Sequence, residues 1–308
     1  MSFTFINNMN TYASMHVLNE LRPEELDDEI GSTIIGTLCP KASQEKPDEI
    51  RKILNRAKPK LFKKYLLESN VLVYDLNSGD LNEIEAAVRM LKTENFDDPK
   101  TLVVISSIFT WGDTPTKMVP REPGDGYPST EEEVNEDDEP ADPAEEAKEA
   151  LDKSRDIKTP ASKISDSRTD QSKIEGEGEE EEEKPPTPKP IKYKPAPFLE
   201  ADFATRVSPS KYEQYKTIED LVLSIKKDNL QGYVISAGVL YGSGERVFSH
   251  HFRKAWMEQP KALPYLGEGD NNVPTIHVKD LARFVKYVIE QKPDSKYLLA
   301  IDRTRNIS

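Results

Sequence analysis

Short apolar runs alternate with helical patterns along most of the chain. An apolar run of four to seven residues that is bounded by polar or turn residues is typical of a buried strand. Strands that are apolar throughout, rather than on alternate positions, are typical of a parallel sheet covered on both faces. The pattern therefore predicts an α/β fold with a doubly wound parallel sheet. Its strands are predicted at Phe3–Ile6, Thr33–Leu38, Val71–Tyr74, Leu102–Ser106, Gly232–Ser236 and Tyr297–Ile301.

Between these runs, apolar residues recur at helical spacing. The stripe from Leu81 to Leu91 follows Asp80, which forms a capping-box pattern with Glu83. Pro209 lies near the start of another helix, as helix starts favour. These further helices are predicted at Asp48–Arg56, Leu61–Glu68, Ser208–Lys227 and Val278–Gln291, with Pro59 separating the first two. The two tryptophans, Trp111 and Trp256, are expected in the core.

Residues 122–197 differ sharply in composition from the rest of the 308-residue chain. They hold 24 acidic and 11 basic residues, which accounts for nearly all of the net charge of −14, and 11 of the 23 prolines. Such a segment buries too little apolar surface to offset its ordering entropy, so we predict a disordered acidic insertion. It divides the folded body into residues 1–121 and 198–308. Either it is a spacer, or it docks a basic partner, as blocks of like charge often do.

Composition also excludes several classes of protein. The acidic balance argues against nucleic-acid binding, and no apolar run approaches the length of a membrane span. The N-terminus lacks the features of a signal peptide, and the single Cys39 suits a reducing cytoplasm. His250 and His251 are adjacent, and their side chains should diverge on a helix, so no metal site is predicted. The sequence holds no Gly-x-x-x-x-Gly-Lys-Ser/Thr phosphate loop, so kinase activity is not expected.

Candidate catalytic chemistry lies on both sides of the acidic insertion. Ser106 and Ser107 end a predicted strand, where a hydroxyl can orient a reacting oxygen. Tyr212 and Lys216 are four residues apart, on one face of the predicted helix. A cation at that position can lower the pKa of the phenol and make it a general acid or base. One Tyr-x-x-x-Lys match among 12 tyrosines carries little weight alone.

Four sequence segments that occur in a fixed order are more specific than the Tyr-x-x-x-Lys match alone. They extend over nearly the whole chain apart from the insertion. They are Ser106–Gly112, Tyr212–Lys216, Gly238–Gly242 and His277–Ala282. Together they resemble the extended short-chain dehydrogenase/reductase family, which includes sugar-nucleotide epimerases and dehydratases. The resemblance implies a Rossmann-like doubly wound parallel sheet with a small C-terminal substrate-type subdomain. It implies NAD(P) as cofactor and places Ser107, Tyr212 and Lys216 at the catalytic positions.

The first turn departs from that family. Where the family has three glycines, this sequence has Asn8, Thr11 and Ser14. Asn8 can adopt a left-handed conformation, but Thr11 places a branched side chain where backbone should approach a pyrophosphate. Ser14 crowds the contact between helix and strand. No carboxylate ends the second predicted strand to bind a ribose, and Lys41 is more simply a solvated lysine than a ligand of a 2′-phosphate. We therefore predict a degenerate site and no bound cofactor.

A second resemblance is to the N-terminal module of a family of ciliary adenylate kinases. It is carried by Phe5–Asn8, by the acidic insertion and by the stretch from Lys211 through Glu245 to Asp302. It implies a cytoplasmic setting in the axoneme of a cilium or flagellum, with axonemal proteins as partners. The first hypothesis is thus a non-catalytic scaffold, a pseudoenzyme. The alternatives are an active NAD(P)-dependent oxidoreductase or epimerase, and a cofactor-sensing module.

Overall fold

A computed structural model of the chain describes residues 3–22, 33–42, 50, 52–120, 193–244, 247–258 and 273–302. The chain divides into two compact units. The larger unit combines Met1–Lys117 with Ala196–Ser308, and the smaller one is Met118–Pro195.

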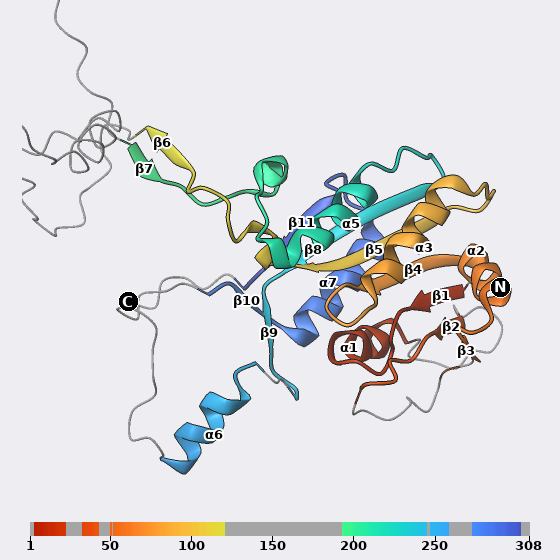
Figure 1. Cartoon of the computed structure of the whole chain (residues 1–308), viewed down its shortest axis with the longest axis horizontal. Coiled ribbons are helices and arrows are strands. Elements are labelled where there is room, and N and C mark those ends of the chain that lie inside the picture. Colours follow the sequence, from red (N-terminus) through yellow and green to blue (C-terminus); the bar gives the residue numbers. More distant parts are fainter. Residues whose placement is uncertain are drawn as a thin grey trace, which may run out of the picture. The chain divides into compact units, whose positions relative to one another are not determined.

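The larger unit contains a parallel sheet of seven strands (Figure 1) in the order β11-β8-β5-β4-β1-β2-β3. The first strand lies inside the sheet, between β2 and β4. The predicted doubly wound fold is confirmed, and all six predicted strands are present. The strands are β1 (Phe3–Ile6), β2 (Thr33–Gly36), β3 (Lys52–Ile53), β4 (Ser69–Asp75), β5 (Lys100–Ser107), β8 (Leu230–Ala237) and β11 (Tyr297–Ala300).

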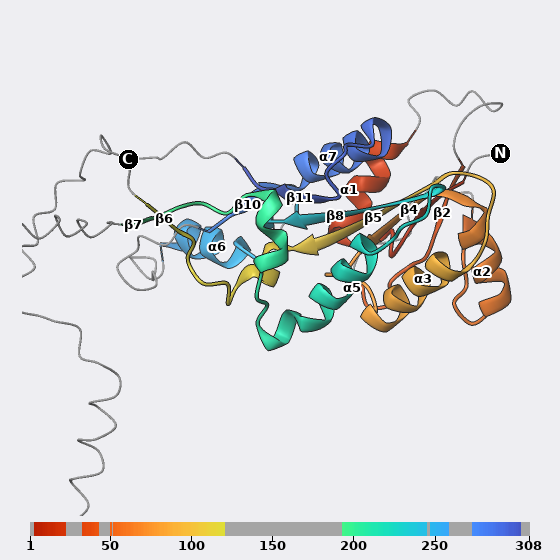
Figure 2. The ribbon, with the colours of Figure 1, turned by 90° about the horizontal axis from the view of Figure 1, so that it is seen from above.

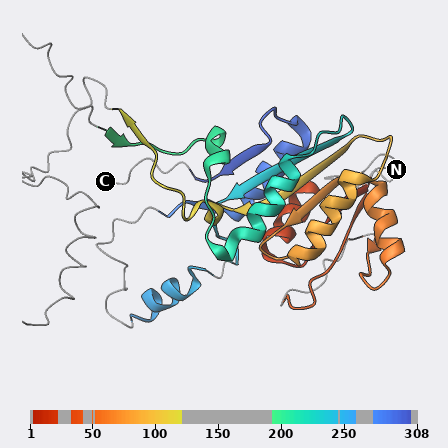
Figure 3. The same cartoon turned by 45° about the horizontal axis from the view of Figure 1, so that its top comes forward.

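Helices cover both faces of this sheet (Figure 2), which explains why its strands are apolar on successive positions. One face packs against α1 (Tyr12–Leu21) and α7 (Val278–Gln291), and the other against α2 (Pro59–Glu68), α3 (Leu81–Thr93) and α5 (Glu213–Leu223). Along β5, Val103 faces the first core and Val104 faces the second, and both are fully buried. Figure 3 shows α3 and α5 next to each other over the second face.

Of the predicted helices, one is absent and another starts later than expected. The segment Asp48–Arg56 is wrong as a helix, because Lys52–Ile53 form the edge strand β3, which pairs with β2. Pairing with a neighbouring strand overrides local helical preference here. The predicted helix Ser208–Lys227 is also wrong in its first part. A 3₁₀ turn, Ser210–Tyr212, precedes α5, which starts at Glu213.

The caps of the other helices follow the sequence more closely. Pro59 does not separate two helices but starts α2, a position where its missing N–H does no harm. The Asp80 carboxylate caps α3 by accepting a hydrogen bond from the Asn82 amide at 3.0 Å. Glu83 does not complete the capping box, since its carboxylate bonds to Arg56 instead. Helix α7 has the predicted bounds.

The larger unit also contains β9 (Val239–Tyr241), α6 (Ser249–Met257), β10 (Thr275–His277) and two further 3₁₀ turns, Ile108–Trp111 and Glu200–Thr205. Strands β9 and β10 form a separate parallel pair. No residue of α6 is buried, and the side chain of Trp256 is 90% exposed, so the expectation that Trp256 lies in the core is wrong. A helical stripe of apolar residues predicts an apolar face, but it does not say whether the same chain covers that face.

The smaller unit contains a two-stranded antiparallel pair, β6 (Met118–Pro120) with β7 (Tyr193–Pro195). Residues 121–192 lie outside the described part of the chain, so most of the predicted insertion is untested. At its end the prediction is wrong, because residues 193–195 form a strand. Backbone hydrogen bonds hold this pair, and composition does not reveal them.

Candidate functional site

The site expected from the topology lies at the carboxyl end of β1. Open α/β sheets bind ligands outside the carboxyl ends of their strands, where the strand order reverses. In this sheet the order reverses between β1 and β4. The candidate glycine positions Asn8, Thr11 and Ser14 all follow β1 directly, in the turn and first helix that should hold a pyrophosphate.

The backbone of this turn is already hydrogen-bonded to the protein. The amide of Asn7 donates to the Val73 carbonyl, and that of Met9 to the Thr37 carbonyl, both at 2.9 Å. The Asn8 amide donates to the Thr37 hydroxyl at 3.0 Å, and the Thr11 amide to the Asn8 carbonyl at 2.9 Å. A pyrophosphate cradle needs such N–H groups to point at the ligand. Four of them have protein acceptors here.

Larger side chains occupy the three glycine positions, of which Asn8 and Ser14 are buried and Thr11 is half-buried. Asn8 has φ of 48°, the left-handed conformation for which the family uses glycine, and its side chain donates to the Ser78 carbonyl at 2.7 Å. Thr11 precedes α1 with its hydroxyl bonded to the Asn8 carbonyl at 2.9 Å. Ser14 is buried in the first turn of α1. Each side chain thus occupies space that a glycine would leave open.

Arg56 connects this turn to the neighbouring strands. Its Nη2 donates to Asn8 Oδ1 at 2.8 Å, to Thr37 Oγ1 at 2.9 Å and to Asn7 Oδ1 at 3.1 Å. Its Nη1 donates to the Leu38 carbonyl at 2.7 Å, and its Nε pairs with the Glu83 carboxylate at 2.6 Å. The guanidinium therefore lies at the end of β2, where the family has a ribose-binding carboxylate.

Sequence reasoning missed Arg56, because it assigned the residue to a helix. Two features of the sequence could have indicated its role. Arg56 comes three residues after β3, and the neighbouring strand β2 does not end in a ribose-binding aspartate or glutamate. Lys41, the candidate for a 2′-phosphate, is exposed. Within the described ranges, no group of three or more His, Cys, Asp or Glu side chains is placed to hold a metal ion.

The loop after β9 also contacts the first half of α1. The Tyr12 hydroxyl donates to the Gly242 carbonyl, and a ring nitrogen of His16 lies 3.4 Å from the Ser243 carbonyl. On the far side of the loop, the His277 ring lies against Gly242, which has φ of 84°. Burial lowers the pKa of His16, which favours its neutral form in this contact.

Two of the predicted catalytic residues lie around Phe109. The Ser107 hydroxyl accepts from the Phe109 amide at 3.4 Å, a local cap on the turn that follows β5. The Tyr212 ring stacks on the Phe109 ring with centroids 5.6 Å apart. The cation nearest to it in the described contacts is Lys211, whose Nζ lies 5.5 Å from the ring centre. The structure thus brings Ser107 and Tyr212 to the same residue, Ser107 to the backbone of Phe109 and Tyr212 to its ring.

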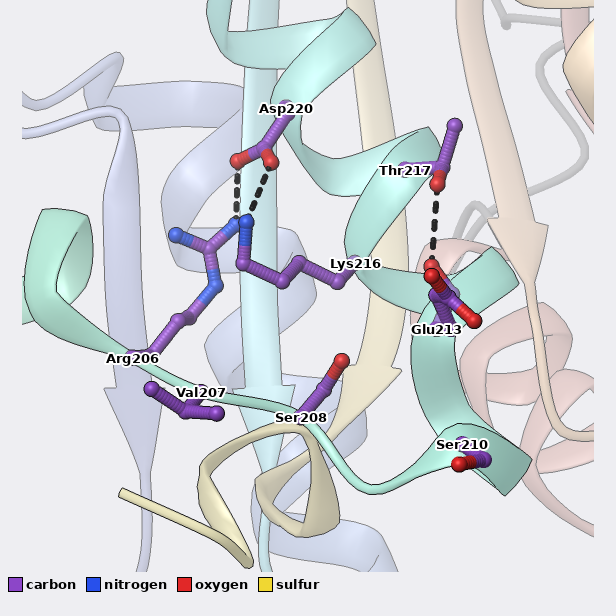
Figure 4. Close-up of a pocket in the computed structure, with 8 residues that line it drawn as sticks. All are labelled: Arg206, Val207, Ser208, Ser210, Glu213, Lys216, Thr217 and Asp220. Atoms are coloured by element: carbon purple, nitrogen blue, oxygen red, sulfur yellow. Dashed lines mark hydrogen bonds and ion pairs between the residues drawn. The ribbon is translucent and has the colours of Figure 1, made fainter. Parts of the chain in front are cut away.

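Lys216 has a different environment (Figure 4). Its Nζ pairs with Asp220 Oδ2 at 2.8 Å, four residues along α5. It lines an open pocket of about 490 Å³ with Arg206 and Asp220, and neither Ser107 nor Tyr212 lines that pocket. Because Tyr212 ends the 3₁₀ turn and Lys216 belongs to α5, the two do not share one regular helix face. Among the described residues, Lys216 makes its charged contact with Asp220 alone.

A buried ion pair lies between α5 and the sheet, and sequence reasoning missed this too. Arg206 Nε pairs with Glu219 Oε2 at 2.8 Å, and both side chains are almost fully buried. Ser106 donates to the other Glu219 oxygen, so Ser106 supports this pair and not a reacting oxygen. Burial raises the pKa of Glu219, and burial together with the Glu219 charge raises the pKa of Tyr297 to about 12. These groups all lie buried in the core.

The comparisons with known proteins agree with the class of fold. No family model matches the chain. The solved structure of dTDP-glucose 4,6-dehydratase from Bacillus anthracis, in complex with NAD, matches with a TM-score of 0.51 at 9% identity. The match covers 99% of this chain and 76% of that one. At this identity the likeness concerns the fold, which is the Rossmann-like fold of an NAD-dependent dehydratase.

Sequence comparison finds similarity to adenylate kinase 7 of two mammals. The chain is 33% identical to adenylate kinase 7 of Mus musculus over 108 residues, which are 34% of this chain and 18% of that protein. It is 42% identical to adenylate kinase 7 of Macaca fascicularis over 72 residues, or 23% of this chain and 14% of that protein. The matches thus span less than a fifth of the length of these relatives. The resemblance to adenylate kinase 7 is confirmed over these stretches.

Proposed function

We propose that this chain is a non-catalytic, dehydrogenase-like docking module of a ciliary axonemal protein similar to adenylate kinase 7. In this proposal the dinucleotide site is degenerate and takes no NAD(P). The chain would dock axonemal proteins, and the acidic segment would be available to a basic partner. A Rossmann-like fold does not by itself confer hydride chemistry, which depends on holding the cofactor.

The observation that carries the proposal is the Arg56 network at the carboxyl end of β1. Arg56 bonds to Asn8, Thr37 and Glu83, and the turn amides bond to the protein. A dinucleotide would have to displace these bonds and the side chain of Thr11. Each lost hydrogen bond that leaves a buried polar group unpaired costs about 1–3 kcal/mol. A pyrophosphate bound at this turn would leave several such groups without their present partners.

The catalytic alternative is less well supported. It needs the Lys216 ammonium beside the Tyr212 phenol, with Ser107 beside both. In the structure Lys216 pairs with Asp220, and Lys211 is the cation over the Tyr212 ring. Any activity of this kind would also need the cofactor, so the same binding experiment tests both the enzyme and the sensor interpretation.

The test is a titration of the purified chain with NADH and with NADPH, followed by cofactor fluorescence and by melting temperature. An NAD-dependent dehydratase serves as the positive control. A ligand at a hundred times its dissociation constant stabilises the folded state by about 2.7 kcal/mol. We expect no shift at millimolar cofactor. Micromolar binding would overturn the proposal, and the Tyr212→Phe variant would then separate an enzyme, which loses turnover, from a sensor, which has none.

A further inference from the structure

Helix α6 presents an unusually large apolar surface to solvent. Phe252, Trp256 and Met257 are 65%, 90% and 57% exposed, and Val247 just before the helix is 54% exposed. No residue of the helix is buried. A cluster of large exposed apolar side chains is uncommon on a monomeric protein and marks an interaction surface.

The residues of α6 are arranged in two faces. Phe248, Phe252 and Trp256 recur every four residues, which places them on one stripe of the helix. Arg253, Lys254 and His250 lie around the remaining face, and no acidic residue occurs between Phe248 and Met257. The helix is therefore basic and amphipathic, although the whole chain carries a net charge of −14.

This pattern limits the chemistry of the partner. An apolar stripe with bulky anchors at i, i+4 and i+8 fits an apolar groove that receives a helix. Cations beside the stripe favour an acidic rim around that groove. A membrane surface is less suitable, because the nine-residue helix carries two full positive charges, Arg253 and Lys254, where a lipid-binding segment typically carries roughly four to eight. The partner that fits α6 is therefore a protein with an apolar groove that binds a helix and has an acidic rim.

Calcium-loaded sensors of the EF-hand class present such a groove. Calcium opens a pair of helices and exposes a methionine-rich apolar surface, and basic amphipathic helices bind to it. We propose that α6 is a docking helix for a calcium-loaded EF-hand protein. This deepens the proposed function by naming a docking surface and the class of partner, and it rests on that function only in treating the chain as a docking module.

The test is a titration of the full chain with calcium-loaded, tryptophan-free calmodulin, followed by calorimetry and tryptophan emission. Trp111 is buried and Trp256 is exposed, so a blue shift on binding reports on Trp256. We expect binding at micromolar or lower concentration, abolished by a calcium chelator. Phe252→Ala and Trp256→Ala should each weaken binding by about tenfold or more, as central aromatic anchors do.

The matched control is Tyr287→Ala, which removes a 53%-exposed aromatic from α7 and should leave binding unchanged. Because α6 has no buried residue, the melting temperatures of its variants should equal that of the parent chain. No binding at about 100 µM calmodulin, or binding that survives in Phe252→Ala and Trp256→Ala, would overturn the proposal. So would binding to phosphatidylserine vesicles without binding to calmodulin. None of these results depends on NADH or NADPH, so the proposed function is tested separately.

Discussion

At the scale of single residues, Arg56 donates five hydrogen bonds around the candidate site. One guanidinium joins the turn after β1, the end of β2 and the start of α3. The guanidinium has five N–H groups in a planar fork, where lysine has three, and the two on Nη2 are shared among three acceptors. The side chain therefore links the loops that surround the candidate site.

The first prediction follows from this network. Arg56→Met should lower the free energy of unfolding by about 2–3 kcal/mol, because Asn7, Asn8 and Thr37 lose a charged donor. Urea unfolding measures the change. Arg89→Met is the matched control, since Arg89 makes an exposed pair with Glu85 in α3 and its loss should cost about 0.5 kcal/mol or less. Equal effects in the two variants would contradict a structural role for Arg56.

A second prediction concerns the pH dependence of stability through Glu219. Burial raises the pKa of this carboxyl in the folded chain above its ordinary value of 4.5. From that value upward, the folded state holds a proton that the unfolded state has lost, so Glu219 contributes less stability as pH rises. Glu219→Gln has no such group. The stability difference, parent minus Glu219→Gln, should therefore decrease from pH 4.5 towards neutral pH.

Urea unfolding of both proteins across this pH range measures that difference. Glu219→Ala, which leaves Arg206 without its buried partner, should cost about 3–5 kcal/mol and checks that the pair forms. A difference that grows with pH would mean that Arg206 outweighs burial and lowers the pKa of Glu219.

At the residue scale, the sequence predicts conformations that depend on one residue, and it does not predict contacts that depend on the tertiary fold. The left-handed turn at Asn8 was predictable, since asparagine tolerates that conformation. The bonds of Arg56 and the Arg206–Glu219 pair were not, because 48 residues separate Arg56 from Asn8, and 13 residues separate Arg206, which lies before α5, from Glu219 within it. Only the packing of β3 beside β2, and of α5 on the sheet, brings them together.

At the scale of elements, the loop after β9 depends on a glycine. Gly242 has φ of 84°, and a Cβ at this position would lie within 2.1 Å of His277 Nε2. Gly244 has φ of 95°, with open space around its Cβ position. The two glycines therefore have similar backbone strain but different crowding, which makes them a matched pair.

We predict that Gly242→Ala destabilises the chain by about 2–3 kcal/mol, from strain and from contact with the ring. Gly244→Ala should cost about 1 kcal/mol, because it adds strain alone. Thermal unfolding monitored by circular dichroism measures both. Adding His277→Ala to each should remove most of the gap between them, and a gap that persists would mean that the ring is not its cause.

Element boundaries were predictable where pattern and caps agreed. The stripe in α7 predicted its bounds, because the helix is amphipathic along its whole length. The start of α5 was not, since the 3₁₀ turn Ser210–Tyr212 continues the same sequence pattern. That small difference places Tyr212 in the 3₁₀ turn and Lys216 in α5, where Tyr212 stacks on Phe109 and Lys216 pairs with Asp220.

At the scale of the whole molecule, the parallel sheet was predictable from apolar runs and landmark order. Sheet order follows from connections that pack helices on both faces, and this constraint applies to the entire larger unit. The exposure of α6 was not predictable, because an apolar stripe looks the same whether it faces a core or a partner. Among the described residues, no helix is both long and apolar enough to cross a bilayer.

The last prediction concerns the independence of the larger unit. The Ala196 amide donates to the Lys117 carbonyl at 2.8 Å, so the two ends of this unit already meet. Replacing Met118–Pro195 by a short Gly-Ser linker should therefore keep its cooperative unfolding. A shorter loop costs less entropy to close, so the free energy of unfolding should stay equal or rise slightly. Urea unfolding followed by Trp111 emission measures it in a Trp256→Phe background. A broadened transition would mean that the smaller unit helps to hold the sheet together.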